Sequence, residues 1–90
     1  MTSTLTDGRT EVLAALRREV GRVRPDLPAD LDGAALLMTD LGLDSLDVVE
    51  LVARVEEKFR ICVADKDWPT LRCLNRIADH VIAHSALELA

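Results

Sequence analysis

The segment from Asp40 to Leu51 constrains the fold of this chain most, because it predicts a tight turn followed by the start of a helix. It reads Asp-Leu-Gly-Leu-Asp-Ser-Leu-Asp-Val-Val-Glu-Leu. Asp44 can accept hydrogen bonds from the first amides of a following helix, and Asp47, three residues later, completes a pattern similar to a capping box. We therefore expect a helix that begins at Ser45, with the serine exposed beside unpaired amides that favour an anion such as phosphate.

The helix predicted from Ser45 to about Phe59 has two apolar stripes. At about 100° per residue, one stripe would face the core and consists of Val48, Leu51, Val52, Val55 and Phe59. A second stripe consists of Leu46, Val49 and Ala53. It is bordered by four acidic residues: Asp47, Glu50, Glu56 and Glu57. Closing a small bundle needs only one stripe, so the second predicts a docking surface with an apolar centre and a charged rim. The alternative is that the core extends round this helix and covers Leu46 and Val49.

Apolar residues at three- and four-residue spacing predict a helix upstream, capped by Asp7 or Thr10 and ended by Pro25. Its core-facing stripe is Val12, Leu13, Leu16, Val20 and Val23. Arginines near its end, including Arg24, are expected only to complement the helix dipole. Residues 25–43 then form a long connection. We expect leucines to pin it to the core: Leu27, Leu31, Leu36, Leu37 and Leu41.

Downstream of the central helix, the pattern predicts one short helix and one long one. Ile61 and Val63 alternate with polar residues and indicate an extended link. A short helical turn is expected over residues 65–69. The last helix would begin between Thr70 and Cys73 and bury Leu74, Ile77, Ala78 and Val81. The predicted fold class is therefore all-α, a small bundle of three main helices plus one short helix.

Length and composition are those of one small helical domain. The chain has 90 residues, and its hydrophobic content of 49% includes one Phe, one Trp and no Tyr, so the core must be aliphatic. We expect a single domain over residues 1–90, with an ordered core from about 7 to 84 and frayed termini. Two cysteines in a chain without a signal peptide or a long apolar run predict a cytoplasmic protein with reduced thiols and no membrane contact. We also expect the protein to be a monomer on its own.

The charge of the chain is unevenly distributed. Residues 1–24 carry five basic and three acidic groups, residues 26–57 one and nine, and residues 58–90 five and four, which gives +2, −8 and +1. The acidic middle third argues against a nucleic-acid surface and favours partners with basic patches. A solvated face that only maintains solubility is the alternative.

Neither of two possible metal patterns is complete. Around Gly33, Asp30 and Asp32 fall on ligand positions of a calcium loop, but Pro28 and Thr39 occupy its first and last positions, where carboxylates are required. We therefore expect no calcium site.

His80 and His84 share a helix face, but a zincin would need a glutamate where Val81 stands. The two cysteines, Cys62 and Cys73, match no close-paired redox or zinc pattern. Ser45 lacks the flanking glycines of a hydrolase elbow and an evident base, so it is better interpreted as a site that another enzyme modifies.

The segment around Ser45 resembles the prosthetic-group site of acyl carrier proteins, and the similarity continues to the Asp79-His80-Val81 end of the last helix. The resemblance implies that a separate transferase joins 4′-phosphopantetheine from coenzyme A to Ser45 through a phosphodiester, with Asp44 as the flanking acid. The thiol of this arm would carry acyl groups as thioesters. The implied partner-docking residues are Leu46, Asp47, Val49, Glu50, Ala53, Arg54, Glu56 and Glu57.

Four positions depart from the fatty-acid carriers that the chain resembles. Arg54 stands where a small or apolar residue is common, Ala53 is smaller than usual, and His80 replaces a common aromatic residue. Cys73 replaces a threonine cap, so we expect Thr70 to cap the last helix instead. These differences favour a dedicated carrier of secondary metabolism, of the polyketide or antibiotic type.

The resemblance implies a phosphoprotein without catalytic activity. Its partners would be the transferase, an acyltransferase or acyl ligase that loads the arm, and a ketosynthase or other pathway enzyme. Two alternatives remain open: an amino-acyl or peptidyl carrier, and an unmodified helical adaptor that binds partners through the central helix.

Overall fold

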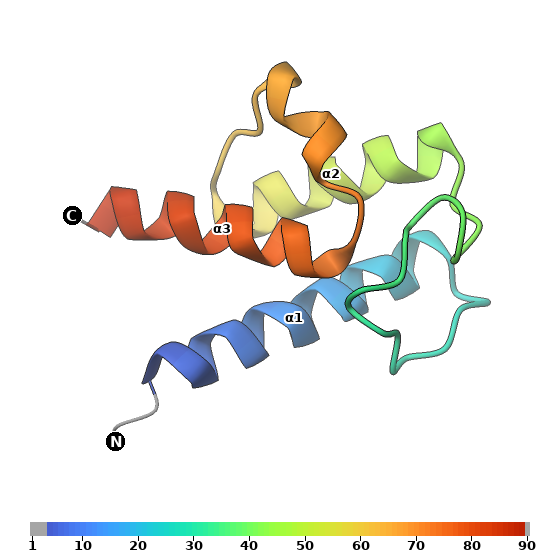
Figure 1. Cartoon of the computed structure of the whole chain (residues 1–90), viewed down its shortest axis with the longest axis horizontal. Helices are drawn as coiled ribbons and strands as arrows, with labels where there is room; N and C mark the ends of the chain where they lie inside the picture. Colours follow the sequence, from blue (N-terminus) through green and yellow to red (C-terminus); the bar gives the residue numbers. More distant parts are fainter. Residues whose placement is uncertain (1–3, 90) are drawn as a thin grey trace.

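Four helices make up the regular structure of the computed structural model, which describes the backbone of residues 4–89 and the side chains of residues 8–84 (Figure 1). They are α1 (Thr4–Val23), α2 (Ser45–Phe59), the short 3₁₀ helix η1 (Asp65–Thr70) and α3 (Leu74–Leu89). The described backbone contains no strand. The predicted all-α bundle of three main helices and one short helix is confirmed. Among the described residues, no helix has the length and hydropathy needed to span a membrane.

The core is aliphatic and forms where α1 packs against both α2 and α3. The fully buried side chains come from all three helices and include Leu16, Val20, Leu51, Val52, Val55, Leu74, Ile77, Ala78 and Val81. Val48 and Phe59 are half-buried at the edge of this cluster. The core-facing stripe predicted for α2 is therefore confirmed. Ile61 and Val63 are also buried, and the link that carries them has no regular structure.

The helix α1 begins earlier than predicted. Since its first residue is Thr4, Asp7 and Thr10 lie inside the helix and do not cap it. Contacts with α3 support this early start: Arg9 makes an ion pair of 2.6 Å with Asp79 and donates a longer hydrogen bond to the carbonyl of Asn75. Tertiary contacts of this kind cannot be predicted from the local sequence pattern. The helix α3 likewise continues to Leu89, beyond the apolar pattern that predicted it.

Leucines anchor the connection between α1 and α2 to the core, as expected. One of the predicted leucines is exposed instead, and one buried leucine was not predicted. Leu31 and Leu37 are buried, and Leu27 and Leu41 are half-buried against the core. Leu36 is 41% exposed, since its neighbour Leu37 takes the inward position. The residue that the prediction missed is Leu43, which is 2% exposed and lies two residues before α2.

Two backbone hydrogen bonds tie this connection to the start of α3. The amide of Leu37 donates to the carbonyl of Arg72 at 2.9 Å, and the amide of Asn75 donates to the carbonyl of Gly33 at 3.0 Å. A Cβ atom at Gly33 would lie 2.5 Å from the side-chain oxygen of Asn75, so a larger residue here would require the Asn75 side chain to move. No group of three potential metal ligands occurs among the described residues.

The start of α3 differs from the prediction at its cap. The carbonyl of Cys73 accepts hydrogen bonds from the amides of Arg76 and Ile77, so the helix begins directly after Cys73. The hydroxyl of Thr70 donates to the carbonyl of Asp67 within η1 at 2.6 Å. The expectation that Thr70 caps α3 is thus wrong, because η1 extends through Thr70 and uses its hydroxyl. Both cysteines are free thiols.

His80 and His84 contact each other on α3. Their rings stack with centroids 3.9 Å apart, and Nδ1 of His84 lies 2.9 Å from the carbonyl oxygen of His80. Nε2 of His80 is buried and has no hydrogen-bond partner among the described residues. Burial and the neighbouring His84 lower the pKa of His80, while Asp67 opposes the shift.

This lowered pKa makes stability depend on pH. The unfolded chain, in which His80 has the ordinary pKa of 6.5, binds more protons than the folded chain below that pH, so stability falls as pH falls through 6.5 and levels off below the folded pKa. His80→Phe keeps a ring but cannot titrate. When the pH is lowered from about 7.5 to 5.5, we expect the melting temperature of this variant to fall less than that of the wild type. Parallel melting curves for the two proteins would contradict the assignment.

Candidate functional site

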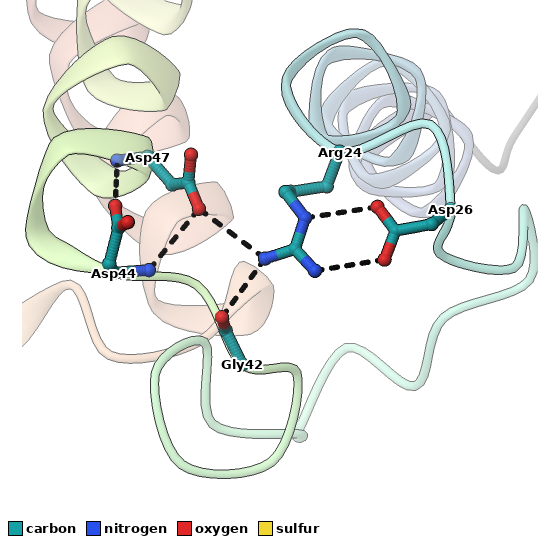
Figure 2. Close-up of polar contacts among 5 residues, drawn as sticks. All are labelled: Arg24, Asp26, Gly42, Asp44 and Asp47. Atoms are coloured by element: carbon teal, nitrogen blue, oxygen red, sulfur yellow. Dashed lines mark hydrogen bonds and ion pairs between the residues drawn. The ribbon is translucent and has the colours of Figure 1, made fainter.

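A reciprocal pair of aspartates fixes the start of α2 (Figure 2). The side chain of Asp44 accepts the amide of Asp47 at 2.8 Å, and the side chain of Asp47 accepts the amide of Asp44 at 3.2 Å. Asp44 has extended backbone angles, and its carbonyl accepts the amide of Val48, the first intrahelical bond. The capping box predicted from the sequence is therefore confirmed, and so are the helix limits, Ser45 and Phe59.

The turn before α2 brings Ser45 to the surface. Gly42 has a φ of 77°, a left-handed conformation that costs glycine little. Leu43 follows with its side chain in the core and its amide bonded to the carbonyl of Leu37 at 3.0 Å. With Leu43 anchored, the next three residues, Asp44, Ser45 and Leu46, are all exposed.

The amides at this helix start are suited to a phosphodiester. Those of Asp47 and Val48 bond to Asp44, but among the described residues no acceptor binds the amides of Ser45 and Leu46. Free amides and the helix dipole together favour a negative group. No described side chain hydrogen-bonds the Ser45 hydroxyl either. The hydroxyl is thus exposed, and none of the described side chains is placed to act as a base on it.

Comparison with known proteins agrees with this geometry. Residues 10–81 match the family model described as the phosphopantetheine attachment site. The chain belongs to this carrier family. Membership implies a covalently attached 4′-phosphopantetheine, whose phosphate is the kind of group that the start of α2 is suited to hold.

Three proteins illustrate the similarity of this carrier to others. The mitochondrial acyl carrier protein of Neurospora crassa is 36% identical over 56 residues, which cover 62% of this chain and 42% of that protein. The acyl carrier protein of Syntrophobacter fumaroxidans is 42% identical over 52 residues, covering 58% and 64%. The non-reducing polyketide synthase Preu3 of Preussia isomera is 30% identical over 73 residues, covering 81% and 3%. The carrier thus spans less than two thirds of the length of each.

The second apolar stripe of α2 lies at the surface of the carrier. Leu46 is 77% exposed, Val49 is 50% exposed, and Ala53 is also exposed. The alternative, in which the core covers Leu46 and Val49, is therefore wrong. Large apolar side chains exposed beside Ser45 form a surface that a partner can bury.

The acidic rim of this stripe is less available than the sequence indicates, because three of its four carboxylates bond within the carrier. Asp47 belongs to the capping box, Glu50 accepts from Arg54 at 3.2 Å, and Glu56 accepts the amide of Val63 at 2.8 Å. Among the described residues, only Glu57 of the four has no hydrogen-bond or ion-pair partner. Of these four carboxylates, Glu57 is therefore the one that a basic partner can pair with without breaking a described contact.

Arg54 also bridges α2 to α1. Its guanidinium lies 3.7 Å from the carboxylate of Glu19, which is 4% exposed and accepts a hydrogen bond of 2.5 Å from Arg22. A buried carboxylate is stable when cations surround it, so Arg54 contributes to helix packing. Sequence reasoning placed Arg54 on the docking face and missed Glu19 because their contact joins residues far apart in the chain.

An apolar groove of about 460 Å³ opens beside the start of α2. Its lining residues come from the α1–α2 connection, α2, η1 and the link between η1 and α3. They include Leu36, Met38, Val48, Trp68, Leu71 and Arg72. The exposure of Leu36 and Met38 is explained by this groove, which the sequence did not predict because its walls come from separate segments.

The contact between Arg54 and Glu19 predicts a stability effect. Because Arg54→Ala leaves the buried Glu19 with only one cation, we expect the free energy of unfolding in urea to fall by about 1–2 kcal/mol. The control Arg18→Ala removes an exposed α1 arginine that has no side-chain hydrogen bond or ion pair with the described residues, and should change stability by less than about 0.5 kcal/mol. When Glu19 is already replaced by Gln, Arg54→Ala should lower the free energy of unfolding by less than it does in the wild type. An equal fall in both backgrounds would show that the two side chains are not coupled.

Proposed function

We propose that Ser45 is the attachment site of the arm and that residues 1–90 act as one acyl carrier domain without catalytic activity of its own. The observation that carries the proposal is the exposed serine at the first position of α2, beside the amides of Ser45 and Leu46, which no acceptor among the described residues binds. A phosphodiester on the serine oxygen would lie within the favourable field of the helix start.

The residues around Ser45 act by holding and presenting it. The capping box of Asp44 and Asp47 fixes the helix start, and the buried Leu43 fixes the preceding turn. When attached, the arm supplies a thiol that holds acyl groups as thioesters. The carrier contributes a tether, which raises the effective concentration of the cargo at each partner's active site.

The partners that fit this carrier dock on α2. Leu46, Val49 and Ala53 form the apolar centre of the surface, and Glu57 with Glu50 forms the charged part of its rim. The partners would be a phosphopantetheinyl transferase, a loading acyltransferase or acyl ligase, and a ketosynthase or other pathway enzyme. A small apolar centre and a charged rim give fast, weak docking that releases easily.

A cargo of the polyketide type is favoured over a plain fatty acyl chain. The groove beside α2 is apolar except near Thr39 and Arg72, and Nε of Arg72 donates to the carbonyl of Pro69. Its other guanidinium nitrogens have no described partner, so they can bond carbonyl or carboxylate oxygens of a bound chain. The match to the polyketide synthase also covers more of this chain than the matches to the two acyl carrier proteins.

The attachment site can be tested by mass. Incubation with coenzyme A and a phosphopantetheinyl transferase should add the mass of one arm to the intact protein, because Ser45 is accessible. Ser45→Ala should gain nothing, and Ser3→Ala, a matched loss of another serine hydroxyl, should gain the arm as wild type does. An arm added to Ser45→Ala would refute this assignment. Partner binding that survives in Ser45→Ala without any modification of the wild type would favour the helical adaptor.

Docking can be tested by charge reversal. Glu57→Lys should slow modification or loading several-fold, mainly through the association rate, and added salt should narrow the difference. The matched control is Glu11→Lys on α1, because Glu11 is also exposed and the change in net charge is the same. Equal rates for the two variants would mean that Glu57 is only part of a solvated face.

A further inference from the structure

Arg24, the residue directly after α1, contacts both sides of the turn that leads to Ser45 (Figure 2). Its Nη1 donates to the carbonyl of Gly42 at 2.9 Å and lies 3.4 Å from a carboxylate oxygen of Asp47. That oxygen also accepts the amide of Asp44 in the capping box. One guanidinium thus contacts the residue three positions before Ser45 and the residue two positions after it.

Asp26 orients this guanidinium. Its two carboxylate oxygens accept from Nε and Nη2 of Arg24 at 3.0 and 2.8 Å. These hydrogen bonds hold the pKa of Asp26 below its ordinary value, so the carboxylate stays charged. A two-point contact of this kind fixes the plane of a guanidinium, which a single contact would not do. With Nε and Nη2 engaged, Nη1 is directed at Gly42 and Asp47, as Figure 2 shows.

The main chain of Arg24 is also held in place. Its amide donates to the carbonyl of Val20 at 2.7 Å, and its carbonyl accepts the amide of Leu27 at 3.1 Å. The side chain therefore projects from a fixed point at the end of α1. Since it bonds to Gly42, it joins the two ends of the long connection. The turn before Ser45 is thereby held at a fixed position relative to the end of α1.

We propose that Arg24 is a positioning residue for the attachment of 4′-phosphopantetheine: it holds the segment from Gly42 to Asp47 in the geometry in which Ser45 is presented to the transferase. This inference rests on Ser45 being the attachment site. Arg24 is not catalytic, because it acts on Ser45 only through the backbone and Asp47. Small misplacements of a reacting group can slow a reaction by up to about a hundredfold, so a restraint on both sides of the serine is expected to affect the rate.

The experiment compares initial rates of modification by coenzyme A and a transferase over a range of carrier concentrations. Arg24→Met removes all four contacts and should lower kcat/KM by roughly three- to tenfold. Arg24→Lys, which keeps a charge and can still reach one acceptor, should fall between Arg24→Met and wild type. The matched control, Arg18→Met, loses the same charge from an exposed position on α1 and should react at the wild-type rate.

A second readout separates positioning from a general loss of stability. The readout is hydrogen exchange, measured on Arg24→Met after circular dichroism has shown that it keeps the helix content of the wild type. The amides of Asp44 and Asp47 should then exchange with solvent faster than in the wild type, while those of the α2 core residues Leu51 and Val55 should exchange at the wild-type rate. If Arg24→Met does not fold, Arg24→Lys is compared with Arg18→Lys, and the slower rate is expected for Arg24→Lys.

The outcomes distinguish this inference from the proposed function. Slow modification of Arg24→Met, together with no modification of Ser45→Ala, supports both. A wild-type rate for the Arg24 variant, or an equal loss in the Arg18 variant, overturns the positioning role and leaves the attachment site intact. Modification of Ser45→Ala overturns the attachment site and the positioning role together.

Discussion

The reciprocal hydrogen bonds between Asp44 and Asp47 are the interaction on which the site depends. They set the first residue of α2, Ser45, which is exposed, and no acceptor among the described residues binds the amides of Ser45 and Leu46. An N-terminal cap of this kind contributes about 1 kcal/mol, which is modest beside the burial of the aliphatic core. Its importance is geometric: the core holds α2 in the bundle, while the cap decides which residue stands at its start.

The parts of the site that could be predicted from the sequence are those encoded by neighbouring residues. The cap, both limits of α2 and its two stripes follow from spacings of three and four residues, and the structure agrees with them. The parts that were missed join different structural elements. The contact of Arg24 with Asp47 and the bond from Val63 to Glu56 depend on how the chain folds back, so no local pattern records them.

The charge distribution in the structure differs from the one that the sequence suggests. Counting residues gives a strongly acidic middle third, and this suggests a uniformly acidic helix face. In the fold, Arg24 from the first third adds a positive charge beside Asp47, and Arg54, the one basic residue of the middle third, pairs with Glu50. The buried carboxylate of Glu19 lies beside Arg22 and Arg54. The charge that a partner meets is thus smaller and more localised than the sequence suggests, which favours short-lived complexes over tight ones.

The two backbone hydrogen bonds between the α1–α2 connection and the segment that leads into α3 have a consequence for the groove beside α2. They link Gly33 to Asn75 and Leu37 to Arg72, and Leu37 and Arg72 themselves line the groove. Two of its walls are therefore joined at the main chain. Changes in the lining side chains can reshape or widen the groove, but separating these two walls requires the hydrogen bond between Leu37 and Arg72 to break.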